Sequence, residues 1–160
     1  MTKRYQTILK DPLYCIELQK LAKFEKNRRF CRHTMEHFLD VARIMYILSL
    51  EAQTTLSKDI IYATALLHDI GRAQEYENGT PHNEASVTIA TCILSSCDYN
   101  DDEIQQITSA IDKHRTETSK TDCLSAYLYQ ADKLSRNCFT CPAYEECYWP
   151  TDKKNHTIYM

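Results

Sequence analysis

The sequence predicts an all-α protein. The chain has 160 residues but only two glycines and four prolines, too few turn residues for a many-stranded sheet. Hydrophobic residues make up 43% of the chain and recur at helical spacing in several segments. We therefore expect a bundle of five or six helices over residues 1–137. A short cysteine-rich extension, residues 138–160, is expected to pack on that bundle.

Three helices are predicted in the first half of the chain. Apolar periodicity indicates helices at 13–24 and 34–52, and the first of these follows a proline. A third is expected over 57–71, because Ser57 is a favourable N-cap residue and Gly71 a favourable terminator. This third helix contains the apolar run 60–67.

The second half is predicted to contain a loop and three more helices. Gly79 and Pro81 interrupt the stretch 74–81, which has little apolar content and is predicted to be a loop. Asn100 followed by Glu103 resembles a capping box. The helices are expected at 83–96, 101–113 and 123–137.

Charge and hydropathy exclude several classes of protein. The formal net charge of −3 is nearly balanced, and one local basic stretch at 20–32 is interpreted as a solvated helix face, so duplex nucleic acid is not expected as a partner. The most apolar window, 41–50, contains Arg43 and is too short to span a bilayer. With no apolar signal core at the N-terminus, the protein is expected to be cytoplasmic, without membrane partners.

Ligand-type residues fall on the apolar faces of four predicted helices. His37, His68, His114 and Asp132 each lie three or four residues from apolar neighbours on the same helix. A lone histidine in such a place is usually a hydrogen-bonded core residue. Burying several imidazoles and carboxylates together is costly unless something compensates them, and a metal ion does so. We therefore expect these residues, with Asp69, to form a metal site.

The same residues carry a resemblance to a known family. His37, the pair His68-Asp69, and Asp132 occur in the stretches HFLDVARI, ALLHDIGR and ADKLSR. In this order they resemble the H…HD…D signature of the HD-domain metal-dependent phosphohydrolases. The resemblance covers residues 30–136 and implies an HD-type helical bundle with a metal centre between its helices.

Two further histidines extend the resemblance. His82 in PHNEAS and His114 in AIDKHR are similar to the extra histidines of family members that hold two metals, such as the diadenosine tetraphosphate hydrolase branch. The resemblance implies that Asp69 bridges the ions and that a shared hydroxide attacks phosphorus. Iron, manganese, zinc, cobalt and nickel all suit such ligands, and the imidazole-rich set favours iron. A site with one metal and four ligands remains open.

Residues beside the ligands are candidates for catalysis. His33 lies one helical turn before His37 and is an alternative first ligand, although the context of His37 matches the family better. Otherwise His33 orients substrate, donates a proton to the leaving group or sits at the rim. Arg72 and Lys133 follow ligands closely and are expected to bind phosphate, with Asp69 completing the catalytic set; Arg115 and Arg136 are similarly spaced.

The C-terminal extension contains a second possible metal site. Cys138, Cys141 and Cys147 have spacings found in zinc and iron–sulfur sites, and Cys31 is a candidate fourth ligand. Free thiols are the alternative interpretation.

The predicted function is hydrolysis of a small phosphate ester or anhydride, most plausibly in a nucleotide. Candidate substrates are dinucleoside polyphosphates, nucleoside monophosphates, cyclic dinucleotides and guanosine alarmones. The chain has no GYP segment after its HD helix, which argues against the cyclic di-GMP branch. A di-iron oxygenase and a non-catalytic nucleotide sensor are the alternatives, and a homodimer is left open.

Overall fold

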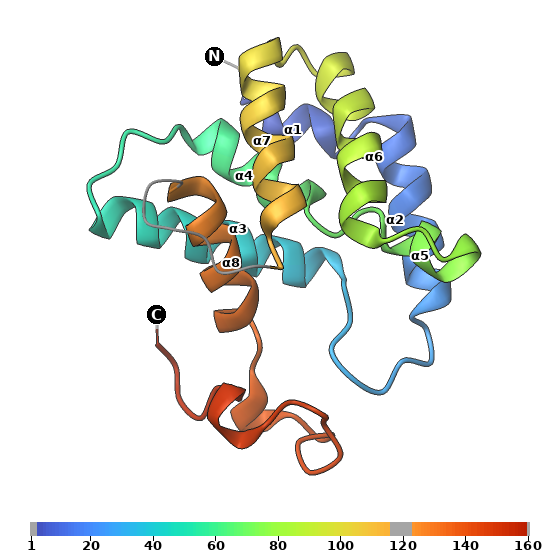
Figure 1. Cartoon of the computed structure of the whole chain (residues 1–160), viewed down its shortest axis with the longest axis vertical. Coiled ribbons are helices and arrows are strands. Elements are labelled where there is room, and N and C mark those ends of the chain that lie inside the picture. The colour runs from blue at the N-terminus through green and yellow to red at the C-terminus, as the bar shows by residue number, and fades with distance from the viewer. Residues whose placement is uncertain (1–2, 116–122, 160) are drawn as a thin grey trace.

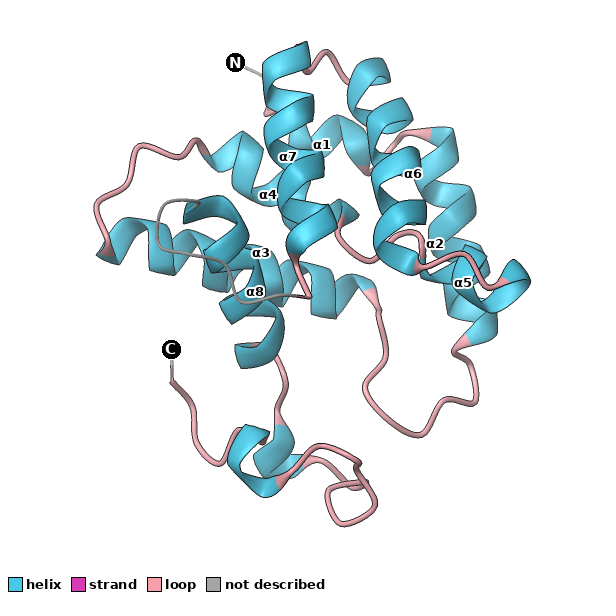
Figure 2. Cartoon of the chain, in the orientation of Figure 1, coloured by secondary structure: helices cyan, strands magenta, loops and turns pink. Residues whose placement is uncertain are grey.

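The computed structural model describes residues 3–115 and 123–159, and this part of the chain is helical with no strand (Figures 1 and 2). The predicted all-α class is confirmed. The elements in chain order are α1 (Tyr5–Ile8), α2 (Pro12–Phe24), α3 (Met35–Glu51), α4 (Lys58–Leu67), α5 (Arg72–Asn78), α6 (His82–Ser96), α7 (Asp101–Lys113), α8 (Cys123–Leu134), and the short 3-10 helices η1 (Cys138–Thr140) and η2 (Thr151–Lys153).

Side-chain caps begin the helices where the sequence predicts them. Ser57 accepts a hydrogen bond from the Ile60 backbone N–H at the start of α4. At the start of α7, Asn100 and Glu103 form both bonds of a capping box. Each such cap satisfies a backbone donor that has no partner within the helix and contributes roughly 1 kcal/mol.

Two of the predicted boundaries are wrong. Residues 74–78, predicted as part of a loop, belong to α5, which ends at Gly79 in the left-handed conformation. The helix predicted over 57–71 ends at Leu67, so His68 and Asp69 lie in a turn between α4 and α5. Because this turn breaks the helical register, the two adjacent side chains need not diverge as they would on a continuous helix.

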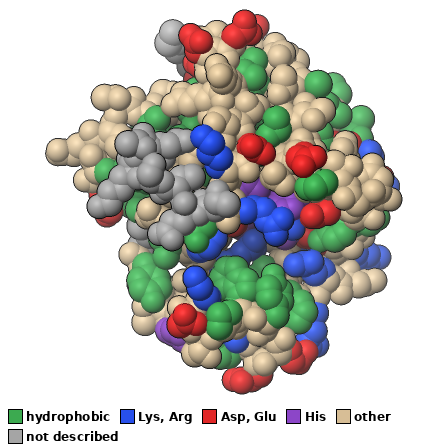
Figure 3. Space-filling view, in the orientation of Figure 1, with side chains coloured by type: hydrophobic (Ala, Val, Ile, Leu, Met, Phe, Trp, Pro, Cys, Tyr) green, Lys and Arg blue, Asp and Glu red, His purple; other side chains and the backbone are tan. Residues whose placement is uncertain are grey.

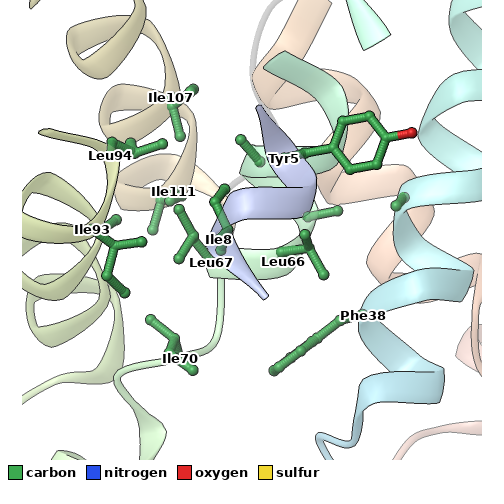
Figure 4. Close-up of a cluster of buried hydrophobic side chains, with 14 of the residues drawn as sticks. Tyr5, Ile8, Phe38, Leu66, Leu67, Ile70, Ile93, Leu94, Ile107 and Ile111 are labelled. Atoms are coloured by element: carbon green, nitrogen blue, oxygen red, sulfur yellow. The ribbon is translucent and has the colours of Figure 1, made fainter. Parts of the chain in front are cut away.

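The core forms around α4, which packs against α1, α3, α7 and α8. Every residue of this helix from Ile60 onward is buried except Tyr62. Figure 4 shows Leu66 and Leu67 of this helix among side chains from α1, α3, α6 and α7. Full burial of a Leu or Ile stabilises the fold by roughly 1.5–3 kcal/mol, so α4 fixes the position of the turn that follows it.

Close packing of α6 against that turn depends on Gly71. A Cβ atom at Gly71 would lie 2.3 Å from the backbone nitrogen of Ser86 and 2.7 Å from the backbone carbon of Ala85. The Gly71 N–H also donates to the Ser86 hydroxyl at 2.9 Å. Glycine therefore lets α6, with His82 at its first turn, approach the residues that follow α4.

The segment after α8 forms a small lobe beside the bundle, coloured orange to red in Figure 1. Within the described residues 138–159 its regular structure consists of η1 and η2 alone, and Ala143 is its one buried hydrophobic residue. The Asn155 amide ties the lobe to the end of α8 by donating to the Lys133 and Arg136 carbonyls at 2.8 and 2.7 Å. Among the described helices, none is long and apolar enough to cross a membrane.

Candidate metal centre

Two overlapping groups of ligand-type side chains lie inside the bundle. Within each group, one ligand atom per residue lies within 4.8 Å of all the others. The first group combines α3, the turn after α4, and α8 through His37, His68, Asp69 and Asp132; the second combines that turn with the start of α6 and the end of α7 through Asp69, His82 and His114. The structure thus brings together all six predicted ligands, and Asp69 belongs to both groups.

The Asp69 carboxylate faces the two groups with different oxygens. Its Oδ2 lies 3.3 Å from His68 Nε2, in the first group. Its Oδ1 lies 3.3 Å from His82 Nε2 and 3.5 Å from His114 Nε2, in the second. Asp132 Oδ1 lies 3.3 Å from His37 Nε2 and 3.7 Å from His68 Nε2. A carboxylate placed in this way has one oxygen available for each of two cations.

Four histidines use one ring nitrogen outside the centre and present the other to it. For each ring, Nδ1 contacts an oxygen of the surrounding protein, which leaves Nε2 directed at the carboxylates. The four contacts are His37 with Ser135 Oγ at 3.2 Å, His68 with the Ala65 carbonyl at 2.7 Å, His82 with Glu75 Oε2 at 3.0 Å, and His114 with the Ile111 carbonyl at 2.5 Å. An imidazole that donates from Nδ1 in this way offers a lone pair on Nε2, the usual arrangement of a metal-ligating histidine.

Several atoms of the centre are buried without a hydrogen-bond partner in the protein. They are Nε2 of His68 and Oδ1 of Asp69 and Asp132. Leaving such a group unsatisfied costs about 1–3 kcal/mol, and more when it is charged. A cation between these atoms satisfies all of them, so the residues present fit a metal centre.

The electrostatics of the centre favour a positive charge. Burial alone would raise the pKa of Asp69, but the charges of His68 and Arg72 and the close imidazoles of His68 and His114 outweigh it and hold that pKa well below its usual range. Burial lowers the pKa of His37 to about 4, although the Asp132 carboxylate 3.3 Å away opposes that effect. His68 differs, because the Asp69 charge and the closeness of both carboxylates outweigh burial and raise its pKa to about 10.

His33 lies beside the centre with a carboxylate behind it. Its Nδ1 contacts Glu25 Oε1 at 2.6 Å, its backbone N–H donates to Glu25 Oε2 at 2.6 Å, and its Nε2 lies 3.4 Å from Asp69 Oδ2. Tyr76 donates a third hydrogen bond to this carboxylate at 2.9 Å. Burial raises the pKa of Glu25, but these bonds and the His33 charge outweigh it and lower the pKa to about 2. Because His37 belongs to the first ligand group and His33 to neither, the structure favours His37 as the first ligand.

A cavity of about 490 Å³ opens onto one side of the centre, between the bundle and the lobe. Figure 3 shows histidine and basic side chains beside this hollow. His33, His37 and Asp132 reach its wall. Five of its lining residues are cationic and two are carboxylates: Arg28, Arg72, Arg115, Arg136 and Lys154 against Asp40 and Asp132. The cavity therefore suits an anionic ligand.

The two predicted phosphate-binding cations are placed differently. Arg72 lines the cavity, and its Nε lies 3.1 Å from Asp69 Oδ1. Lys133 does not line the cavity, because its ammonium lies 3.7 Å from the ring centroid of Tyr129. Arg136 takes the place expected of Lys133, with Nη2 3.4 Å from the Nε2 atoms of both His33 and His37.

The supporting carboxylates Glu25 and Glu75 are absent from the residues predicted from sequence. Glu25 follows α2 and meets His33 across a loop, and Glu75 lies in the segment predicted to be a loop. No local pattern distinguishes them from the other acidic residues of the chain. The four predicted cysteines all line the cavity, Cys138, Cys141 and Cys147 from the lobe and Cys31 from the loop before α3.

Two similar sequences and one similar structure were found. An uncharacterized protein from Clostridium beijerinckii is 46% identical over 156 residues, covering 98% of each chain. Ribonuclease Y of Mycoplasma mycoides is 29% identical over 121 residues, which are 75% of this chain but only 26% of the ribonuclease. A crystal structure of a predicted HD superfamily hydrolase from an uncultured Thermotogales bacterium matches with a TM-score of 0.65 and 20% identity, covering 89% of this chain and 79% of the other.

The match to a family model shows to which protein family the chain belongs. The model of the HD domain matches residues 34–137, which contain all six candidate ligands. HD domains bind divalent metal ions, in agreement with the buried histidines and carboxylates that converge here. The chain belongs to the HD domain family.

Proposed function

We propose that the protein is a metal-dependent phosphohydrolase that acts on a nucleotide and uses two divalent metal ions. The observation that carries this proposal is the placement of Asp69, whose two oxygens face separate groups of imidazoles beside a cationic cavity. His37, His68 and Asp132 would hold one ion, His82 and His114 the other, and Asp69 both. The branch of diadenosine tetraphosphate hydrolases remains one candidate relative.

The side chains around the centre bind the substrate and supply a proton to its leaving group. When bound, the two ions supply a water molecule of lowered pKa as the nucleophile and neutralise charge on the phosphate oxygens. Arg72 and Arg136 point guanidinium groups at the same side of the centre, where they can bind nonbridging oxygens. In its imidazolium form, with Nδ1–H held by Glu25, His33 has its Nε2–H directed at the centre and can give that proton to the leaving oxygen, which returns the ring to its neutral form.

The walls of the cavity support a nucleotide as the substrate. Its volume of about 490 Å³ lies in the range of small-molecule sites. Phe30, Tyr148 and Trp149 line it, and aromatic rings offer stacking surfaces for a base. Ribonuclease Y, by its name, acts on a phosphodiester between nucleotides, which agrees with this substrate class.

The test is metal-dependent release of product from a panel of phosphate substrates. The panel contains dinucleoside polyphosphates, nucleoside monophosphates, cyclic dinucleotides and guanosine alarmones, each tested with Mn²⁺, Zn²⁺, Co²⁺ and Ni²⁺ and, under anaerobic conditions, with Fe²⁺. Asp69→Ala is expected to lose both metal and turnover, because the variant removes a ligand from each group. Asp102→Ala, at an exposed position in the first turn of α7, serves as the matched control and is expected to keep both.

Three results would contradict the proposal. Full activity of Asp69→Ala would show that the reaction does not use this centre. Oxygen consumption without phosphate release would identify the oxygenase chemistry of the fold instead, and tight nucleotide binding without turnover under any metal would identify a sensor.

A further inference from the structure

The lobe after α8 lacks the apolar contacts that would hold it in one conformation. Within residues 138–159 Ala143 alone is a buried hydrophobic residue, whereas Phe139 and Tyr148 are 41% and 75% exposed. A segment this short cannot build a sufficient hydrophobic core, and small units of this kind need a disulfide or a metal to become stable. The described residues of the lobe contain no disulfide.

Three of the four cavity-lining cysteines lie on successive tight turns of this lobe. The Cys141 N–H donates to the Cys138 carbonyl, the Tyr144 N–H to the Cys141 carbonyl, and the Cys147 N–H to the Tyr144 carbonyl, at 3.1, 3.1 and 3.4 Å. This chain of turns folds the segment back on itself, and all three cysteines reach the wall of the same cavity. The compact loop is the usual form of a thiolate site for zinc or an iron–sulfur cluster.

The fourth cysteine comes from the opposite side of the cavity. Cys31 lies in the loop before α3, where Arg28 Nε donates to its carbonyl at 2.8 Å. Burial raises the pKa of Cys31, Arg136 opposes that effect, and the thiols of Cys138, Cys141 and Cys147 raise that pKa further, in agreement with their place on the same cavity wall. Contacts beside the cysteines hold the same two segments together: Arg29 pairs with Glu146, and the rings of Phe30 and Tyr148 lie 6.2 Å apart.

The distances between the cysteine sulfurs distinguish a site for a single zinc ion from a site for an iron–sulfur cluster. A single zinc ion draws four sulfurs to about 2.3 Å from one point, which places them within about 4 Å of one another. Among the described residues, no three cysteine sulfurs lie within 4.8 Å of one another, although all four cysteines line one cavity. A cluster that binds each thiolate through its own iron holds the sulfurs farther apart.

We propose that Cys31, Cys138, Cys141 and Cys147 bind an iron–sulfur cluster that fastens the C-terminal lobe to the loop before α3. Each thiol releases its proton, and the four thiolates bond to the irons of a cluster that brings its own inorganic sulfide. Arg28, Arg136 and Lys154 line the same cavity and offset the negative charge of the four thiolates. The cluster does not depend on the phosphohydrolase activity proposed above.

Acid-labile sulfide is the decisive measurement, because the centre in the bundle contains none. The full chain is purified anaerobically and reconstituted with equal amounts of ferrous and ferric iron and with sulfide, and we expect about four sulfides per chain, with a broad visible absorption that bleaches on reduction. Cys31→Ser, Cys138→Ser, Cys141→Ser and Cys147→Ser should each lose most of the sulfide. Cys92→Ser, at an exposed position on α6, should keep it.

The Asp69→Ala variant distinguishes the proposed cluster from the proposed phosphohydrolase centre, because it should lose the metal of the bundle and retain the sulfide of the lobe. Absence of sulfide from reconstituted wild-type protein would overturn the cluster, and this result needs no variant to fold. Zinc bound to the four cysteines in place of sulfide and iron would also overturn it. Full sulfide retention by Cys31→Ser would remove Cys31 from the site and with it the proposed link between the two segments.

Discussion

At the scale of single residues, the ionised carboxylate of Glu25 is the most consequential support of the centre outside the ligands. It accepts three hydrogen bonds, two of them from His33, and the third comes from Tyr76 on α5. These bonds hold the His33 ring with Nδ1 at Glu25 and Nε2 directed at Asp69 Oδ2. Glu25 touches none of the six ligands, so its effect on the reaction passes through His33.

Replacing Glu25 with glutamine should therefore lower turnover more than substrate binding. The amide cannot accept from both the backbone and the ring as the carboxylate does, so the orientation of His33 is lost. We expect kcat to fall roughly 10–100-fold with KM and metal content little changed. Steady-state kinetics and elemental analysis on the same preparation measure both effects.

Glu17 provides a matched control for this substitution. It is a buried carboxylate of α2, the helix that Glu25 follows, and its Oε1 pairs with Lys20 at 3.0 Å. Glu17→Gln should affect stability but leave kcat unchanged. An equal loss of kcat in both variants would show that Glu25 acts through general stability and not through His33.

At the scale of helices, local chemistry in the sequence predicted where most elements begin. Ser57 and the Asn100–Glu103 pair cap α4 and α7 as expected, because a cap depends on residues only three apart. The convergence of His37, His68 and Asp132 was also predictable, since each shares a face with apolar residues that must turn inward. These elements required no knowledge of tertiary contacts.

The sequence could not predict elements that depend on contacts between distant segments. The helix α1 has four residues, too few to show a period, and a long-range ion pair of Arg4 holds its start. The helix α5 was hidden by Asn78 and Gly79, which end it, and it packs on α2 and α6. Glu25 and Lys133 illustrate the same limit, because only the fold shows that one meets His33 and the other meets Tyr129.

The close approach of α6 to the turn after α4 gives a test at this scale. Gly71→Ala forces a methyl group into the backbone of Ser86 and should destabilise the protein by about 2 kcal/mol. Moving α6 also moves His82, so metal content should fall together with the free energy of unfolding. Urea unfolding and elemental analysis measure the two effects.

Gly79 is the matched control for Gly71. Its φ is +79° and nothing lies within 4 Å of a Cβ atom at this position, so Gly79→Ala adds backbone strain without a clash. It should cost about 1 kcal/mol and leave the metal content unchanged. Unchanged metal content in Gly71→Ala would show that α6 does not depend on this contact to place His82.

The start of α1 depends on a charged contact that should respond to pH. Arg4 Nη1 and Nη2 donate to the two Glu103 oxygens at 2.7 Å each, and Arg4 Nε lies 3.4 Å from Asp59. The hydrogen bond with Arg4 lowers the pKa of Glu103 below its ordinary value of 4.5. Because its pKa is lowered in the folded state, Glu103 makes its full contribution to stability when the pH is above its ordinary pKa. That contribution is lost as the pH falls through the lowered pKa.

The substitution Arg4→Gln should therefore destabilise the protein at neutral pH and have less effect in acid. Both side chains are partly exposed, so we expect about 1 kcal/mol at pH 7. Urea unfolding of wild type and variant across the acidic range measures the difference between them. If the difference in unfolding free energy between wild type and variant stays constant down to full protonation of Glu103, the Arg4–Glu103 ion pair does not stabilise the fold.

At the scale of the whole molecule, the metal centre joins most of the bundle. Its ligands come from α3, the turn after α4, α6, α7 and α8, which are far apart in the sequence. Bound cations would therefore add a direct link between these helices. They also compensate the buried oxygens of Asp69 and Asp132 that have no partner in the protein.

Removing the metal should lower the thermal stability of the whole domain. A ligand at a thousand times its Kd stabilises the native state by about 4 kcal/mol, which corresponds to a shift in Tm on the order of 10 °C for a chain of this size. Calorimetry before and after chelation, and again after Mn²⁺ is added back, measures the shift. Asp69→Ala should show no such cycle, and a wild-type protein with the same Tm in all three states would contradict the prediction.

The four histidine ligands differ in whether a mutation elsewhere can remove the partner of their Nδ1 atom. His68 and His114 are oriented by the main-chain carbonyls of Ala65 and Ile111, which survive any substitution that preserves the helices. His82 and His37 rely on the side chains of Glu75 and Ser135, and a single codon change can remove either. Variation among descendants of this chain can therefore retune the affinity of each ion through these two supports, while the other two imidazoles keep their orientation.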